Sequence, residues 1–205
     1  MKKTLTILIL TLVTGICAFT SCNSKSNDNV SKETPIDQLK NYIIEHGTIS
    51  NYKKTDDSGY YDLYKIEYDS EIDDIIFSCV GVYVDDESDI INESYPSENR
   101  DSSTTIHLDY KSTYSFVKWS SWSDGRKYFD ITANLDKSIF SKSNNTMYDI
   151  NITDWQKHFD YYPDTKNLLE SRFKREVATT LNHVEELLKT TNIGITLNDL
   201  GYSNY

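Results

Sequence analysis

Glycine and histidine are scarce in this sequence, and the motifs built from them are missing. The 205 residues include seven glycines, and no G-x-S-x-G, P-loop or G-x-G-x-x-G motif occurs. Serine hydrolases and nucleotide-binding proteins usually carry these motifs. None of the four histidines stands at metal-ligand spacing from another, and there is no H-E-x-x-H or C-x-x-C. We therefore predict no cofactor and no metal site, and no catalytic residue can be assigned.

Basic charge is also in short supply. The chain has 21 basic and 32 acidic residues, a net charge of −11. A surface of this sign repels phosphate backbones, so we predict no nucleic-acid partner. Hydrophobic residues make up 38% of the chain and tyrosine alone contributes 16 positions. This content predicts a packed core rather than disorder, and the length suits one ordinary domain.

No long hydrophobic run suits a transmembrane helix, but a short one lies near the start. Lys2 and Lys3 precede an apolar stretch over residues 5–13, which is the layout of a secretory signal peptide. The sequence AFTSC then ends at Cys22, with the small Ser21 before the cysteine and Phe19 where leucine is usual. This stretch resembles the lipobox of bacterial lipoproteins. The alternatives are ordinary signal cleavage and a retained anchor.

The resemblance implies a lipoprotein signal peptide over residues 1–21 and lipidation of Cys22. The protein would then be held in the bacterial cell envelope, lipid-anchored to a membrane on its extracytoplasmic side. Residues 22–34 are polar and predict a flexible tether, followed by a single domain over residues 35–205. Cys17 would leave with the signal peptide, and Cys79 would remain as a buried small hydrophobe without a disulfide partner.

The patterns along the domain predict an α+β fold. Apolar residues recur at helical spacing over residues 35–46, and again over a long stretch from residue 163 to about 190. Between them lie segments rich in tyrosine, isoleucine, valine and threonine, separated by turn-forming residues. We expect an antiparallel sheet of about six strands, with the short N-terminal helix and the long C-terminal helix packed on one face. The predicted strands are 60–68, 75–84, 104–110, 112–122, 126–135 and 146–152.

The hairpin around Asp124-Gly125 permits a prediction of register. A two-residue turn there would place Trp122 opposite Lys127 and Phe116 opposite Ala133. Alternation along the strands then predicts one core-facing set and one outward-facing set of side chains. The core-facing set is Tyr114, Phe116, Phe129, Ile131, Ala133 and Leu135, and the outward-facing set includes Val117, Trp119 and Tyr128.

Three aromatic residues of this hairpin are the candidate ligand-binding site: Trp119, Trp122 and Tyr128. Exposed flat rings suit a glycan or a protein partner. The favoured function is a binding module displayed at the envelope.

One alternative is a carrier or envelope-assembly factor that holds an apolar ligand between sheet and helix, in a cavity lined by Phe116, Ile131 and Phe173. A third is an enzyme whose catalytic residues assemble from distant positions. The acidic segment 84–101 is interpreted as a solvated loop rather than a cation site.

Overall fold

The structure is a computed structural model, and it describes nine stretches of the chain. These are residues 33–55, 58–92, 95–109, 111–123, 126–139, 141–142, 148–149, 152–157 and 163–202. The chain divides into the units Met1–Lys32 and Glu33–Tyr205. The first unit holds the predicted signal peptide, Cys22 and most of the tether, all of which lie outside the described residues. The described residues all belong to the second unit.

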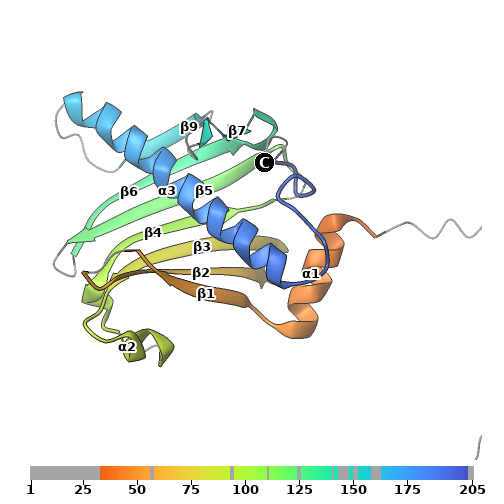
Figure 1. Ribbon diagram of the computed structural model, residues 1–205. Helices are drawn as coiled ribbons and strands as arrows, with labels where there is room; N and C mark the ends of the chain where they lie inside the picture. The colour runs from red at the N-terminus through yellow and green to blue at the C-terminus, as the bar shows by residue number, and fades with distance from the viewer. Residues whose placement is uncertain are drawn as a thin grey trace, which may run out of the picture. The chain divides into compact units, whose positions relative to one another are not determined.

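A seven-stranded antiparallel sheet forms the body of this unit (Figure 1). The strands follow one another across the sheet in chain order, with β9 beside β6 at one edge and β1 at the other. Their bounds are β1 Ile49–Lys54, β2 Tyr60–Asp69, β3 Asp74–Tyr83, β4 Arg100–His107, β5 Tyr114–Ser123, β6 Arg126–Asp136 and β9 Ile152–Lys157. A separate small pair joins β7 Ser141–Lys142 to β8 Tyr148–Asp149.

Two helices cover one face of the sheet. Helix α1 spans Pro35–His46, and α3 spans Pro163–Thr190 and crosses the sheet obliquely (Figure 1). Both contribute to the same hydrophobic core as the strands. A short α2, Glu87–Ile91, and the 3-10 turns Ser97–Asn99 and Lys137–Ile139 lie in connections. The predicted α+β class is confirmed. Within the described stretches, no helix is both long and apolar enough to cross a membrane.

Local sequence explains where α1 begins and ends. The hydroxyl of Thr34 accepts a hydrogen bond from the backbone N–H of Asp37, whose carboxylate accepts from Thr34 in return. This reciprocal capping satisfies two backbone donors of the first turn. Pro35 occupies the first helical turn, where its missing N–H costs nothing. Gly47 ends the helix with a φ of 88°, which favours glycine.

The apolar stripe of α3 forms the centre of the core. Phe173, Val177 and Leu181 are all buried against the sheet. They meet strand residues from its middle, including Phe77 and Ile106. Burying a side chain of this size stabilises the fold by about 1.5–3 kcal/mol relative to leaving it exposed. The stripe predicted from spacing is confirmed, with Leu169, Phe173, Val177, Leu181, Val184 and Leu188 all buried.

A β-bulge between β5 and β6 overturns half of the predicted hairpin register. Trp122 pairs with Lys127 as expected, but Ser121 pairs with Phe129, so that Tyr128 is an extra residue on β6. From there on, each β5 residue meets a β6 residue one position farther along than predicted, and Phe116 lies opposite Asn134. A one-residue shift turns every side chain of a strand to the other face.

This bulge determines which side chains of β5 and β6 point toward the core. On β6, Ile131, Ala133 and Leu135 are buried as predicted. On β5 the prediction is wrong: Val117 and Trp119 are buried, while Tyr114 and Phe116 are 41% and 44% exposed. The side chain of Phe129 and the turn residues Asp124 and Gly125 lie outside what the structure describes.

The edges of the sheet also differ from prediction. β1 was not predicted; only Ile49 and Tyr52 of its six residues are partly buried, so its pattern is weak. β9 begins at Ile152, where the predicted last strand ends.

The acidic segment 84–101, interpreted from the sequence as a loop, contains the short helix α2. The carboxylate of Asp86 caps this helix by accepting a hydrogen bond from the backbone N–H of Ser88.

Candidate functional site

Trp119 does not belong to a binding surface. Its side chain is fully buried beneath α3, with its ring centroid 6.1 Å from that of Phe173. The guanidinium carbon of Arg172 lies 5.6 Å from the centre of the indole ring. The expectation that Trp119 is exposed was wrong, because the bulge at Tyr128 turns it into the core.

The other two predicted site residues stay near the hairpin end. Trp122 is half-buried, and the Lys127 ammonium lies 5.6 Å from the centre of its ring, a cation–π distance. The backbone of Tyr128 forms the bulge, but its side chain lies outside the described part of the chain. Trp119, buried in the core, therefore does not share a surface site with the half-buried Trp122. The predicted lipidation site, Cys22, also lies outside the described residues.

The face of the sheet opposite α1 and α3 is called here the outer face. Its side chains alternate with those of the core along each strand, and on β5 they include Tyr114, Phe116 and Lys118. The α2 segment packs on one end of this face, in a small cluster of Tyr61, Val82, Val84 and Ile90. Exposed aromatic side chains on the remaining outer face make it a candidate binding surface.

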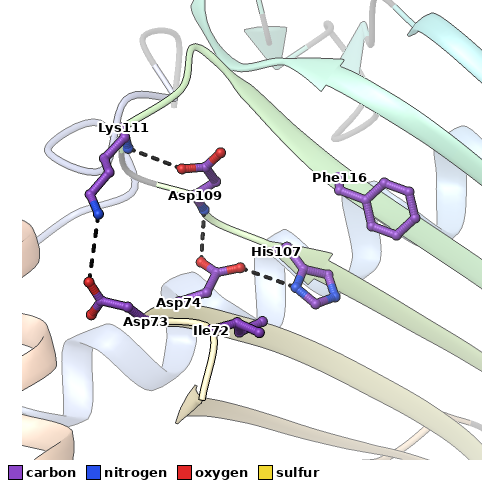
Figure 2. Close-up of a pocket in the computed structure, with 7 residues that line it drawn as sticks. All are labelled: Ile72, Asp73, Asp74, His107, Asp109, Lys111 and Phe116. Carbon is purple, nitrogen blue, oxygen red and sulfur yellow. Dashed lines mark hydrogen bonds and ion pairs between the residues drawn. The ribbon is translucent and has the colours of Figure 1, made fainter. Parts of the chain in front are cut away.

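A hollow of about 430 Å³ lies on the outer face, where the β2–β3 turn meets the end of β4 (Figure 2). We call it the His107 hollow. Its volume is within the range of small-ligand sites. His107 ends β4 and Phe116 lies on the neighbouring β5, with their ring centroids 5.7 Å apart in an edge-to-face arrangement. Its lining residues are Ile72, Asp73, Asp74, His107, Asp109, Lys111 and Phe116.

A continuous chain of polar contacts runs along one side of the hollow, as Figure 2 shows. The Asp74 carboxylate, only 8% exposed as a residue, contacts His107 Nδ1 at 3.1 Å and accepts the backbone N–H of Asp109 at 2.9 Å. The Asp109 carboxylate accepts the backbone N–H of Lys111, whose ammonium lies 3.7 Å from Asp73. These contacts hold the imidazole and the charged groups in fixed positions around the hollow.

The hollow also concentrates unusual backbone geometry. Asp73 has a φ of 54° and Asp109 a φ of 32°. Among the described residues, Asn192 is the third non-glycine residue with positive φ. Asp and Asn tolerate this region better than most residues, but it still costs free energy. Strained residues cluster at functional sites. Two of them line this hollow, which supports a functional role for it.

Asp73 is held in its ionised form. The Lys40 ammonium of α1 donates to its carboxylate at 2.5 Å, and the hydroxyl of Tyr68 donates at 3.0 Å. The Lys40 hydrogen bond is the main reason that the pKa of Asp73 falls to about 2. The rim of the hollow therefore keeps a carboxylate, with charge partners on two sides, at all ordinary pH values.

A wider hollow of about 620 Å³ lies near α2 and the β1 edge. Its lining mixes apolar and polar side chains, with Ile91 64% exposed. The lining residues are Ser50, Asn51, Tyr52, Leu63, Tyr64, Lys65, Ser78, Val80, Ile90, Ile91 and Tyr95. Lys65 is the one charged residue among these described lining residues.

The chemistry of the His107 hollow favours binding over covalent catalysis. The Asp74–His107 pair resembles the base and its orienting acid in a hydrolase, but the described lining residues include no serine, threonine or cysteine to act as nucleophile. Hydroxyl-rich ligands fit better, since carboxylates accept their hydrogen bonds and a flat ring packs on their C–H faces.

Sequence analysis missed this site because its parts are far apart in the chain. Asp74 and His107 are separated by 33 positions and meet only because β3 and β4 pair with Ile76 opposite His107. Phe116 joins them only because of the bulge. The available signal was the unusual density of aspartate around residues 69–74 and 109, which by itself is typical of turns.

Comparison of this chain with protein-family models, with curated proteins and with solved structures gives no match.

Proposed function

We propose that this protein is a lipid-anchored binding module of the bacterial envelope, and that it binds a glycan at the His107 hollow. The observation that carries the proposal is the exposed ring of Phe116 beside a fixed Asp74–His107 pair, in a hollow on the face that α1 and α3 leave uncovered. The ring would pack on a sugar face while the surrounding polar groups bond to its hydroxyls.

The charge of the hollow supports a neutral or hydroxyl-rich ligand. Three aspartates line it, against Lys111 and His107, and the whole chain carries a net charge of −11. A strongly anionic ligand such as a nucleic acid would be repelled. A protein partner is the competing class, because it could use the wider hollow near α2 at the same time.

The carrier alternative loses support from the packing. Of its three proposed lining residues, Ile131 and Phe173 are buried in the core between sheet and helix, but Phe116 lies on the outer face. The buried rings of Trp119 and Phe173 pack against each other between the sheet and α3, with centroids 6.1 Å apart. Covalent catalysis is disfavoured at the His107 hollow, because its described lining residues include no serine, threonine or cysteine nucleophile.

A glycan-array screen tests the proposal. The intact protein should bind a defined set of glycans, and Phe116→Ala should weaken that binding at least tenfold. His107→Ala should weaken it too, since it removes the fixed imidazole. Ile44→Ala is the matched control, because Ile44 is a similarly exposed apolar residue on α1, away from the outer face. Binding that survives Phe116→Ala, or no glycan binding at all, would contradict the proposal.

The anchoring part of the proposal depends on the N-terminal sequence alone. Lys2, Lys3, the apolar stretch and the lipobox-like AFTSC support export and lipidation at Cys22. Several acyl chains on one cysteine hold a protein to a membrane almost permanently. The binding domain would then act on ligands outside the cytoplasm.

A further inference from the structure

A second Asp–His pair lies on the helix-covered face of the sheet, and a cysteine lies beside it. Asp62 belongs to β2, Cys79 to the adjacent β3 and His183 to α3. One ligand atom from each lies within 4.8 Å of the other two. Cys79 and His183 are buried, and Asp62 is half-buried at the margin. Carboxylate, thiolate and imidazole are the three side-chain ligands of zinc.

The geometry of the pair suits ligation of one ion. His183 Nε2 lies 3.1 Å from Asp62 Oδ2. Two ligand atoms bound to one tetrahedral zinc at about 2.0–2.2 Å lie roughly 3.3–3.6 Å apart. The ring of Tyr64 stacks on the imidazole with centroids 4.0 Å apart and planes 8° from parallel. This stacking fixes the orientation of the imidazole ring. Because 3.1 Å is close to the separation of two zinc ligands, Asp62 and His183 would need to move little to share a cation.

The second nitrogen of His183 gives independent support. Nδ1 is buried and has no hydrogen-bond partner among the described residues. The nearest acid, Glu186, places Oε2 at 3.6 Å, longer than an ordinary hydrogen bond. Histidines that bind a metal through one nitrogen usually donate the other N–H to a carboxylate. A small shift of His183 toward that arrangement would satisfy Nδ1 as well.

The surroundings are wrong for a nucleophilic cysteine. Burial raises the pKa of the Cys79 thiol well above its usual range, and the nearby Asp62 and Glu176 raise it further. Reactive cysteines have the opposite environment, electropositive and partly exposed. The three residues are therefore no catalytic triad, although they contain its residue types.

The same charges favour a bound cation. Besides Asp62, the carboxylates of Glu176 and Glu186 border the cluster. Their cationic partners are Arg172 and Arg175 for Glu176, at 3.8 and 3.7 Å, and Lys53 for Glu186, at 3.4 Å. Burial still raises the pKa of Glu176, despite both arginines. A divalent ion at the thiol would relieve the repulsion between these three carboxylates.

We propose that Asp62, Cys79 and His183 form a binding site for zinc or a zinc-like divalent cation that joins β2, β3 and α3. On binding, the S–H bond of Cys79 breaks, its proton leaves to solvent, and a metal–sulfur bond forms without any electron transfer. The protein supplies three ligands, and solvent reaches the cluster from the side of Asp62, whose side chain is 22% exposed. Sequence analysis predicted no metal site because these residues are 17 and 104 positions apart along the chain.

Cobalt titration of the full chain in mild detergent tests this proposal. Cys17 and Cys22 are replaced by serine, so that Cys79 is the only thiol. Added Co²⁺ should produce a one-to-one sulfur-to-cobalt charge-transfer band, which excess Zn²⁺ should remove. Cys79→Ala should abolish the band, and both Cys79→Ala and Asp62→Asn should weaken zinc binding at least tenfold. Zinc should also raise the melting temperature of the parent, and not that of Cys79→Ala.

The Asp74–His107 pair offers a matched control. It has the same 3.1 Å separation but belongs to the outer face, and the described lining of its hollow has no thiol. His107→Gln should leave the cobalt band and the zinc affinity unchanged. Circular dichroism of each variant confirms that it is folded. The proposal is overturned if the folded parent shows no charge-transfer band, or if Cys79→Ala binds zinc as tightly as the parent does.

Discussion

Phe116 and Trp119 lie three positions apart on β5 and point to opposite faces of the sheet. Trp119 is fully buried against Phe173, whereas Phe116 is 44% exposed beside His107. Their difference does not come from hydrophobicity, since both are large aromatic residues. It comes from the face of the strand that each occupies, and therefore from the register of one hairpin.

Alanine substitutions at these two positions should have contrasting effects on stability. Trp119→Ala should lower the free energy of unfolding by about 3–5 kcal/mol, because it leaves a large cavity under α3. Phe116→Ala should lower it by less than about 1 kcal/mol, because the ring is half in solvent. Urea denaturation followed by circular dichroism measures both. Equal losses would contradict the assignment of faces.

Asp73 should make the free energy of unfolding depend on pH in the acid range. Its pKa in the folded protein is about 2, against an ordinary 3.8, mainly because Lys40 donates to it. A carboxyl with a lowered folded-state pKa stabilises the fold above its unfolded pKa, and that contribution is lost as pH falls toward the folded value. The loss should therefore occur between about pH 4 and pH 2.

Urea denaturation at several acid pH values checks this expectation. Asp73→Asn should be less stable than the parent at pH 6, and the difference should shrink as the pH falls to about 2. Lys40→Met is the companion variant, because it removes the main cause of the shift. In the Lys40→Met background, Asp73→Asn should have a much smaller pH-dependent effect. A constant difference between Asp73→Asn and parent across this pH range would contradict the assignment.

At the scale of elements, the local sequence was enough to predict both helices that pack on the sheet. The stripe from Leu169 to Leu188 and the capped start of α1 were both legible in the sequence, because helix spacing and capping are local properties. The alternation of β6 gave Ile131, Ala133 and Leu135 correctly as core residues. These elements need no information from elsewhere in the chain.

The remaining elements depend on partners that the sequence does not reveal. Nothing local distinguishes a tight hairpin from one with an extra residue at Tyr128, and that one residue decides the faces of Phe116 and Trp119. The edge strand β1 has a weak pattern because little of it is buried. The Asp74–His107 pair forms only when β3 and β4 pair. The Asp62–Cys79–His183 cluster also requires α3 to pack on β2 and β3.

Deleting Tyr128 should therefore be far more damaging than changing its side chain. Deletion removes the bulge and forces β5 or β6 to turn its buried residues outward. We expect loss of the cooperative thermal transition, measured by circular dichroism. Tyr128→Ala keeps the residue count and should retain the transition. A deletion variant that melts like the parent would show that the bulge does not set the register.

At the scale of the whole molecule, the sheet divides two roles between its faces. One face carries α1, α3 and the hydrophobic core, and the proposed metal site lies at that interface. The outer face carries α2 at one end and the His107 hollow at another.

The anchor makes its own prediction about the mature chain. Intact-mass spectrometry of protein purified from bacterial membranes should show loss of residues 1–21 and added acyl mass on Cys22. Cys22→Ala should remain unlipidated and keep its leader. Cys17→Ala should be processed like the parent, because Cys17 lies within the leader. A parent chain that begins at Met1 without acyl mass would refute the anchor.

The central claim is that ligands bind at the His107 hollow on the outer face. Backbone amide chemical shifts, recorded by NMR during titration with the tightest array glycan, test it most directly. We predict that the largest shifts fall on Asp74, His107, Asp109 and Phe116, and that α1 and α3 are little affected. Shifts concentrated on the exposed sides of α1 or α3, with none around His107, would contradict the claim.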